Sequence, residues 1–290
     1  SSRRHALPVL QGLNLAPIYR LLSTVYRFLS RTSSMKNTLF DLTGRVALVT
    51  GGSKGLGLAM ARGFAEAGAD VVISSRHENE LQAAVAKIQD GTGVRAEFIV
   101  ADMTERKDVA RLCETALALM KRVDILVNNA GSNTVQAIDQ IRDEDWDRLI
   151  ELNLTSCMAT CRALVPQMKE RRWGRIIHMS SIMGLASKEE RNIYSATKSA
   201  LLGLCRASAL ELGAYNITVN CIAPGPFMTD LPGSMLTDEQ KKGFADRTAL
   251  GRWGQPREMA GPALLLASEA GSYITGSVLL VDGGTLVKTF

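Results

Sequence analysis

The 290-residue sequence has no apolar run that approaches the roughly 18–20 uncharged residues needed to cross a membrane, so no transmembrane segment is expected. None of its five cysteines forms a CxxC or CxxxH motif. We therefore interpret the cysteines as small, reduced core residues and expect no disulfide framework. The three histidines, His5, His77 and His178, lie far apart in the sequence and no HExxH motif occurs, so no metal site is expected.

Aspartate and glutamate are absent from residues 1–36, which carry six of the 34 basic residues. The rest of the chain has 28 basic residues against 29 acidic ones, so the net charge of +5 comes from this leader. A body so close to neutral does not indicate a nucleic-acid partner.

The leader is amphipathic as well as basic. On a helical wheel Leu21 and Leu29 share one face, and Arg20 and Arg27 share the opposite face. This pattern resembles an organelle transit peptide, which would direct the protein to a mitochondrion or another organelle. It is also typical of a helix that lies on a membrane surface. The remaining interpretation is a non-native or upstream extension before a start at Met35, with which we expect a cytoplasmic protein.

From Arg45 onward, short β-rich apolar runs alternate with helical stretches, as is typical of a parallel sheet covered on both faces. No linker, charge block or internal repeat divides this body. We predict a single α/β domain over residues 37–290, with a doubly wound, Rossmann-like parallel sheet of about seven strands. The predicted strands are Val46–Thr50, Asp70–Ser74, Arg95–Val100, Ile125–Asn128, Arg175–Met179, Thr218–Ile222 and Val278–Val281. The predicted helices are Gly57–Ala67, Glu78–Gln89, Lys107–Met120, Asp143–Glu170, Tyr194–Gly213 and Pro256–Leu266.

One stretch, residues 225–254, interrupts this alternation. It contains Pro226, Pro232, Gly233 and a short helical piece, Asp238–Arg247. An insertion between two core strands is typical of a lid that covers a substrate. The alternative is a plain surface excursion.

A glycine-rich turn follows the first predicted strand. The turn Thr50–Gly57 has the spacing TGxxxGxG and precedes a predicted helix. Its glycines would let a pyrophosphate approach the backbone, and the amides at the helix N-terminus would face the negative charge. About twenty residues on, where NAD enzymes often place an acid for the ribose 2′-hydroxyl, the chain has Ser74, Ser75 and Arg76. Arg76, together with Lys54 in the turn, would attract a 2′-phosphate, so we predict a preference for NADP(H), with NAD(H) possible. The alternative for Arg76 is a solvated charge at a strand end.

Tyr194 and Lys198 are four residues apart in a predicted helix, so their side chains lie on one face, one turn apart. An ammonium group near a phenol favours the phenolate, because an opposite charge stabilises the ionised form of an acid. A tyrosine in this setting can act as a general acid or base. Ser181, thirteen residues before Tyr194, could hydrogen-bond the oxygen of a carbonyl or alcohol. Taken alone, the YxxxK spacing is also typical of an ordinary surface helix.

Six features occur in one order along the body. They are TGxxxGxG at Thr50–Gly57, the run Asn128-Asn129-Ala130-Gly131, Asn153, Ser181, YxxxK at Tyr194 and Lys198, and Pro224-Gly225. Over about residues 41–287, the combination closely resembles the short-chain dehydrogenase/reductase family. The resemblance implies a seven-stranded doubly wound sheet and hydride transfer between NADP(H) and a carbonyl or secondary alcohol. It also implies a homotetramer or homodimer.

The resemblance gives each catalytic candidate a role. Tyr194 would pass the proton, and Ser181 would hold the reacting oxygen. Lys198 would favour ionisation of Tyr194 and grip the nicotinamide ribose. Asn153, at a helix interruption, would anchor a water molecule in a proton relay. Ser180 leaves open which of two adjacent hydroxyls acts, and the thirteen-residue spacing favours Ser181.

The resemblance also marks the residues around the cofactor. The run Asn128–Gly131 would support the sheet edge beside it, and Asp102 would touch the adenine. Thr229 would contact the carboxamide together with Ile222. The full set is Gly51, Ser53, Lys54, Gly55, Leu56, Gly57, Ser75, Arg76, Asp102, Met103, Asn129, Ala130, Gly131, Tyr194, Lys198, Pro224, Gly225 and Thr229.

Two kinds of family member share the remaining motifs. The segments Phe40–Gly44, Arg252–Gly254 and Val281–Gly284 resemble gluconate 5-dehydrogenase-like sugar-acid enzymes. The segment Tyr273–Gly276 is equally close to 3-oxoacyl-[acyl-carrier-protein] reductases. We therefore expect a sugar acid such as 5-ketogluconate, with a 3-oxoacyl thioester of fatty-acid synthesis as the alternative. A catalytically silent NADP-binding regulator would be expected to lose the tyrosine or the lysine, and this chain keeps both.

The expected substrate contacts are Ser181, Met183, Tyr194 and Phe227. Further pocket candidates are Ser132, Asn133, Lys188, Glu189, Arg191 and Met228. Lys188 or Arg191 could hold a carboxylate, or both could be solvated loop charges.

Overall fold

Seven strands form one parallel sheet in the computed structural model, which describes residues 38–229 and 237–288. Their order is β3-β2-β1-β4-β5-β6-β7, which reverses direction between β1 and β4 and confirms the predicted doubly wound fold. The predicted strand bounds agree with the observed ones to within two residues. The strands are β1 (Val46–Thr50), β2 (Asp70–Ser75), β3 (Ala96–Val100), β4 (Ile125–Asn128), β5 (Gly174–Met179), β6 (Ile217–Pro224) and β7 (Val278–Val281).

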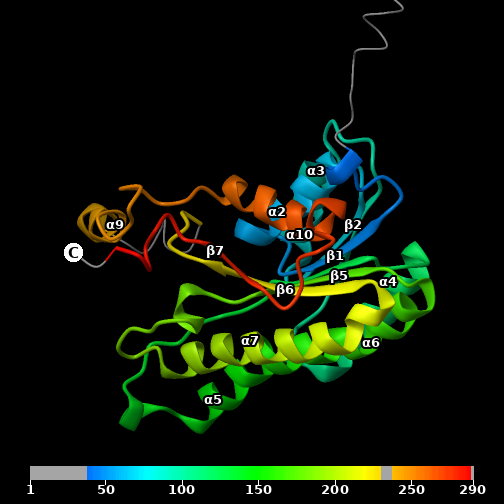
Figure 1. Cartoon of the computed structure of the whole chain (residues 1–290). Helices are drawn as coiled ribbons and strands as arrows, with labels where there is room; N and C mark the ends of the chain where they lie inside the picture. The colour runs from blue at the N-terminus through cyan, green and yellow to red at the C-terminus, as the bar shows by residue number, and fades with distance from the viewer. Residues whose placement is uncertain (1–37, 230–236, 289–290) are drawn as a thin grey trace, which may run out of the picture. The chain divides into compact units, whose positions relative to one another are not determined.

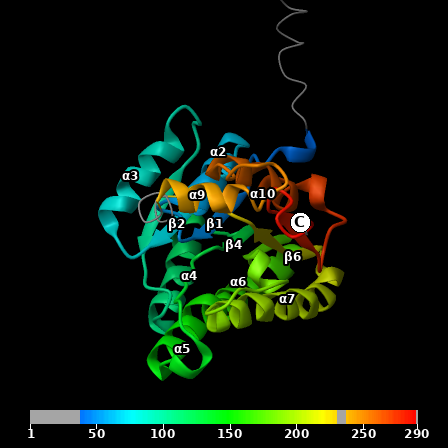
Figure 2. The ribbon, with the colours of Figure 1, turned by 90° about the vertical axis from the view of Figure 1, so that its left-hand side faces the viewer.

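Helices cover both faces of the sheet. Helices α2, α3 and α10 lie on one face, and α4, α6 and α7 lie on the other, with α5 beyond them (Figures 1 and 2). The helices are α2 (Gly55–Glu66), α3 (Glu78–Gln89), α4 (Arg106–Met120), α5 (Asp143–Ile150), α6 (Ser156–Arg171), α7 (Asn192–Leu212), α9 (Asp238–Ala245) and α10 (Ala260–Ala267). Short 3-10 turns occur at η1 (Thr38–Phe40), η2 (Ile138–Gln140), η4 (Ile182–Gly184), η5 (Gly213–Tyr215), η6 (Pro256–Met259) and η7 (Glu269–Gly271). Within the described ranges, no helix has the length and apolar character needed to span a bilayer.

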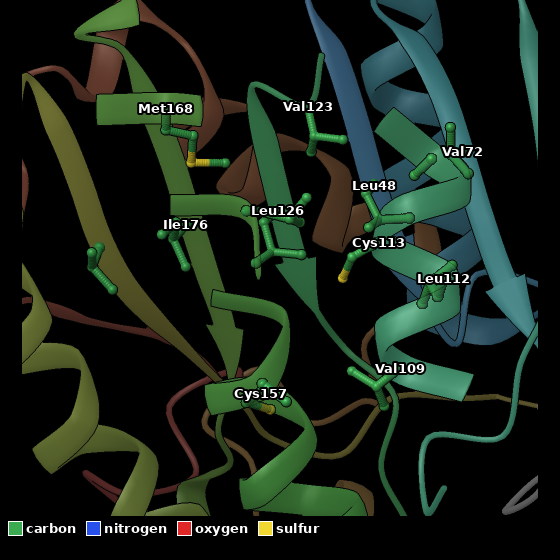
Figure 3. Close-up of a cluster of buried hydrophobic side chains, with 14 of the residues drawn as sticks. Leu48, Val72, Val109, Leu112, Cys113, Val123, Leu126, Cys157, Met168 and Ile176 are labelled. Carbon is green, nitrogen blue, oxygen red and sulfur yellow. The ribbon is translucent and has the colours of Figure 1, made fainter. Parts of the chain in front are cut away.

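Each face of the sheet has its own apolar core. Leu48, Leu126 and Ile176 are register partners on β1, β4 and β5, and they pack with Leu112 of α4 and Cys157 of α6 (Figure 3). The residue after each of the three strand residues belongs to the core on the opposite face, since successive strand side chains alternate. Burial on both sides explains why the strands read as continuous apolar runs.

The helix predicted over Asp143–Glu170 is not an α-helix throughout. A π-helical turn, η3 (Glu151–Thr155), separates α5 from α6. The backbone stays helical from α5 through η3 to α6, so a helix over this range is confirmed, but the π turn inside it was not predicted. Asn153 lies in this turn, where the family resemblance placed a helix interruption. The predicted helix Pro256–Leu266 likewise begins as the 3-10 turn η6 and becomes α-helical at Ala260.

The predicted leader, residues 1–36, lies outside the described residues, as do residues 230–236 of the predicted lid. The rest of the lid contains the expected short helix, α9. The rings of Phe244 in α9 and Trp253 lie 5.2 Å apart, and Trp253 Nε1 donates to the carbonyl of Lys241 at 2.8 Å. Phe227 after β6 forms a parallel bridge with Gly254. These contacts attach α9 to the chain that leaves β6.

Candidate active site

The turn after β1 is held by the loop after β4. Thr50 Oγ1 accepts hydrogen bonds from the backbone amides of Asn129 and Ala130, both at 3.0 Å. Asn129 Nδ2 donates to the carbonyls of Thr50 and Gly51 at 2.9 and 3.0 Å. Gly51 has a φ of +63°, and a Cβ at Gly57 would lie 2.2 Å from the Gly51 carbonyl oxygen. The turn therefore presents bare backbone at the N-terminus of α2, which fits a dinucleotide pyrophosphate.

Two of the predicted phosphate contacts share an acidic partner. Ser53 Oγ and Lys54 Nζ donate to the Glu80 carboxylate at 3.1 and 3.2 Å. The bond from Lys54, above all, lowers the pKa of Glu80 from its ordinary value. Arg76 is exposed, and within the described part of the chain no acceptor pairs with its side chain. Arg76 is thus the cation at this end that is open to a 2′-phosphate, while Lys54 is engaged.

Other predicted cofactor residues follow the carboxyl ends of β3 and β6, where a doubly wound sheet forms a crevice outside its strand ends. Asp102 Oδ1 accepts hydrogen bonds from the backbone amide and hydroxyl of Thr104 at 2.9 and 2.8 Å. Thr229 lies against the glycine turn, because a Cβ at Gly55 would be 3.3 Å from Thr229 Cγ2. This places Thr229 beside the expected pyrophosphate position, and its proposed carboxamide contact stays a prediction. Met103 is buried after β3.

Tyr194 and Lys198 occupy the first turns of α7, as expected from their spacing. Lys198 Nζ lies 5.5 Å from the centre of the Tyr194 ring and donates to the Met179 carbonyl at 2.7 Å. Ser181 follows β5, and its Oγ accepts a hydrogen bond from the Met183 amide at 3.1 Å. Ser181 and Tyr194 line one cavity, and Lys198 is buried behind it. The structure therefore brings the three predicted residues together.

The two adjacent serines have different surroundings. Ser180 is buried, and its hydroxyl donates to the Lys198 carbonyl at 2.8 Å. A Cβ at Gly184 would lie 2.6 Å from that hydroxyl oxygen, so the contact is tight. Ser180 joins the end of β5 to α7, and Ser181 is the serine that lines the cavity.

Asn153 ties the loop after β4 to α7. Its Oδ1 accepts a hydrogen bond from the Ser132 amide at 3.0 Å, and its Nδ2 donates to the Ser132 carbonyl and to Thr197 Oγ1 at 2.9 and 3.1 Å. A Cβ at Gly131 would lie 3.1 Å from Asn153 Oδ1 and 3.3 Å from Lys198 Nζ. These are positioning contacts, and the predicted role in holding a water molecule stays a prediction.

The cavity has a volume of about 790 Å³. Most of the predicted pocket residues line it, whereas Ser132 and Met228 do not. The predicted residues on its walls are Asn133, Ser181, Met183, Lys188, Glu189, Arg191, Tyr194, Pro224, Gly225 and Phe227. The lining residues that the sequence did not single out for the pocket are Ile182, Ala186, Ser187, Pro226, Phe244, Arg247, Trp253, Thr285 and Leu286. Phe244 and Trp253 could have been predicted, because both are aromatic residues within the predicted lid, residues 225–254.

The segment after β7 completes the far wall. The Asp282 carboxylate accepts hydrogen bonds from the amides of Gly284 and Leu286, both at 2.9 Å. Lys288 Nζ donates to the carbonyls of Asp246 and Thr248 at 2.5 and 3.3 Å. These bonds connect the end of α9 to the segment that holds Leu286 in the cavity wall.

His178 on β5 is buried close to the site but faces the core. Burial lowers its pKa to about 4, and its Nδ1 lies 3.2 Å from Asn128 Nδ2. Within residues 38–229 and 237–288, no group of three or more His, Cys, Asp or Glu side chains is placed to hold a metal ion.

One end of the crevice is shaped for a dinucleotide, and the other places a phenol and a hydroxyl where an alcohol or ketone can react. Together they define an oxidoreductase that acts on CH–OH groups. A family model described as enoyl-(acyl carrier protein) reductase matches residues 51–285. With this match, the chain belongs to the short-chain dehydrogenase/reductase family.

Curated relatives and solved structures cover nearly the whole body. The chain is 40% identical to 3-oxoacyl-[acyl-carrier-protein] reductase FabG of Chlamydia trachomatis over 243 residues, which are 84% of this chain and 98% of that protein. It is 35% identical to gluconate 5-dehydrogenase of Gluconobacter oxydans over 254 residues, 86% of this chain and 98% of that protein. A gluconate 5-dehydrogenase from Burkholderia cenocepacia, solved with NADP and tartrate, is 34% identical with a TM-score of 0.81, covering 87% of this chain and 99% of that one.

Proposed function

We propose that the protein transfers a hydride between NADP(H) and a ketone or secondary alcohol. The observation that carries the proposal is the placement of Ser181 and Tyr194 on one cavity wall with Lys198 buried behind them. The bare glycine turn would hold the pyrophosphate, and Arg76 would pair with the 2′-phosphate. The presence of NADP in the Burkholderia cenocepacia relative supports the same preference, and NAD(H) stays a weaker alternative.

When bound, the cofactor supplies or accepts the hydride, and the chain handles the proton. In the reducing direction, Tyr194 would donate its phenolic proton to the substrate oxygen. Ser181 Oγ would donate a hydrogen bond to the same oxygen and fix its position. Lys198 would place its ammonium beside Tyr194 and the nicotinamide ribose. Asn153 would keep the loop after β4 and α7 in register around these groups.

We propose a sugar acid such as 5-ketogluconate as the substrate. Two gluconate 5-dehydrogenases among the relatives support it, and the cavity carries more cationic than acidic side chains. The second candidate is a 3-oxoacyl thioester, which is favoured by the 40% identity to the Chlamydia trachomatis reductase.

A substrate screen tests the proposal. Purified protein is mixed with NADPH or NADH and with 5-ketogluconate, an acetoacetyl thioester and simple ketones, and loss of the reduced cofactor is followed. We expect the highest kcat/KM with NADPH and 5-ketogluconate. A clear preference for the thioester would select the second candidate, and no turnover of any carbonyl would reject the proposed reaction.

We also propose that the chain forms a homotetramer or homodimer. β7 is an edge strand of the sheet, and Leu280 on it, Tyr273 before it and Leu210 on α7 are exposed apolar residues. An unpaired edge with exposed apolar side chains is a common site of association between chains. Light scattering after size exclusion measures the mass in solution, and a monomer at working concentration would reject this proposal.

A further inference from the structure

Arg191 lines the cavity but has no partner in the chain that the structure describes. Its Nε and Nη1 are buried without a hydrogen bond, and within the described ranges no acceptor bonds any of its side-chain nitrogens. Burying these two N–H groups without a hydrogen-bond acceptor costs free energy that no contact among the described residues offsets. The natural complement to such a group is an anion that enters the cavity.

The backbone that carries Arg191 is fixed. Arg191 forms a parallel bridge with Gln136, whose amide donates to the Glu190 carbonyl at 3.0 Å. Asn192 Nδ2 donates to the Gln136 carbonyl at 3.3 Å, and Gln136 Nε2 donates to Asp145 at 2.8 Å. Gln136 Oε1 is itself buried without a partner among the described residues. The fixed backbone and the two buried nitrogens favour the carboxylate-binding alternative for Arg191 over that of a solvated loop charge.

The charges around the cavity favour an anionic ligand. Its ionisable lining includes Lys188, Arg191 and Arg247 against a single acid, Glu189, in the described part of the chain. Arg191 directly precedes α7 and lies three residues before Tyr194, and both residues line the same cavity. An anion at Arg191 would therefore lie within a few carbon atoms of the oxygen that Tyr194 serves.

We propose that Arg191 binds the carboxylate of the substrate and selects a keto acid over its neutral counterpart. This inference rests on the proposed function and sharpens it. A planar guanidinium can bind a carboxylate through two parallel hydrogen bonds, with one edge matching both oxygens. 5-Ketogluconate has a carboxylate at one end and its ketone near the other. A 3-oxoacyl thioester has no free carboxylate for Arg191 to bind.

A matched pair of substrates isolates this contact. L-Sorbose has the carbon skeleton and ketone of 5-ketogluconate, but a hydroxymethyl group replaces the carboxylate. In Arg191→Gln we expect kcat/KM for 5-ketogluconate to fall by roughly 10–100-fold, in line with the loss of a hydrogen-bonded charge. For L-sorbose we expect a change of less than about threefold. Arg191→Lys, which keeps the charge, should retain part of the preference.

The control is Lys188→Gln, which removes the same charge from the same cavity. It should change the ratio of the two kcat/KM values by less than about threefold. Equal losses on both substrates in Arg191→Gln would overturn the inference and leave the proposed reaction intact. The inference would also be overturned if Lys188→Gln lowered the preference for 5-ketogluconate over L-sorbose as much as Arg191→Gln does.

A second measurement does not depend on turnover. Calorimetric titration with tartrate, a small dicarboxylate, should show binding to the NADP-loaded wild type that weakens by roughly tenfold or more in Arg191→Gln and not in Lys188→Gln. Equal tartrate binding by the wild type and Arg191→Gln, or none by the wild type, would overturn the inference. If no carbonyl is reduced at all, the proposed function fails while the titration still decides the role of Arg191.

Discussion

The two ends of the crevice differ in how far the chain itself satisfies their polar groups. After β1, Thr50, Asn129 and Lys54 all have hydrogen-bond partners within the chain. Before α7, Arg191 and Gln136 keep buried polar atoms without partners in the described residues. The glycine turn at the cofactor end is thus held by the chain itself, with Arg76 left open to a phosphate, whereas the substrate end keeps buried polar atoms that a ligand could satisfy. We infer that the choice of substrate is decided mainly at the second end.

We expect the largest effect at Tyr194, where a substitution should lower kcat and leave cofactor binding nearly unchanged. Tyr194→Phe removes the proton donor while keeping the ring, so we expect kcat to fall by about 10²–10⁴-fold. The dissociation constant for NADPH, measured by fluorescence titration, should stay within about twofold, because the glycine turn does not involve the phenol. Tyr215→Phe is the matched control, since Tyr215 lies near Lys169 at η5, away from the cavity. Substantial residual activity in Tyr194→Phe would remove the proton-transfer role.

At the cofactor end, we expect the affinity for NADPH to depend on the exposed charge of Arg76. Arg76→Ala should weaken NADPH binding by roughly 10–100-fold and NADH binding by less than about twofold, because only NADPH carries a 2′-phosphate. Arg95→Ala, at the opposite end of the sheet before β3, should change neither value. Equal losses for the two cofactors in Arg76→Ala would argue against the 2′-phosphate contact.

One added methyl group should disrupt the close packing of the glycine turn. Gly57→Ala would place a Cβ 2.2 Å from the Gly51 carbonyl oxygen, so the turn must shift. We expect a loss of about 1–3 kcal/mol in the free energy of unfolding, as is typical of overpacking, with weaker NADPH binding. Gly261→Ala in α10 is the control, because its Cβ would meet no atom within 4 Å among the described residues. Denaturant titration of both variants checks this, and an unaffected Gly57→Ala would show that the turn is looser than the structure indicates.

We expect the smallest effect on cofactor binding from Glu80, the acid that accepts hydrogen bonds from Ser53 and Lys54 of the glycine turn. Glu80→Gln removes the charge that holds Lys54 and that would repel a 2′-phosphate. We expect NADPH binding to strengthen by about two- to fivefold, the scale of an exposed ion pair, with little change for NADH. Glu78→Gln, in the same first turn of α3, carries the same charge change and should have no effect. Weaker NADPH binding in Glu80→Gln would mean that Glu80 supports the cofactor site instead of competing with it.

Much of the fold could be predicted because its signals are local. The runs of β1 and β4 have the predicted bounds, since strands buried on both faces are mostly apolar along their length. The edge strand β7 has the predicted bounds as well. The glycine turn and the Tyr194–Lys198 spacing are likewise written in short stretches of sequence. A helical spacing places two side chains on one face wherever the helix lies in the fold.

The features that could not be predicted depend on contacts between distant segments. The pairing of Glu80 with Ser53 joins residues 27 positions apart on different elements. The π turn at Asn153 is stabilised by hydrogen bonds to Ser132 and Thr197, which no periodicity reveals. The different surroundings of Ser180 and the partnerless state of Arg191 also appear only when the loops are assembled.

The bonds from Lys288 to the carbonyls after α9 have a further consequence. They fasten the chain at the end of α9 to the segment that places Leu286 in the wall of the cavity, so a displacement of α9 would move this wall as well. Substitutions in the segment after β7 can therefore change the shape of the cavity without changing the glycine turn that would bind the dinucleotide. Redesign of the pocket for other substrates could begin at Lys288, whose bonds link two of the segments that line it.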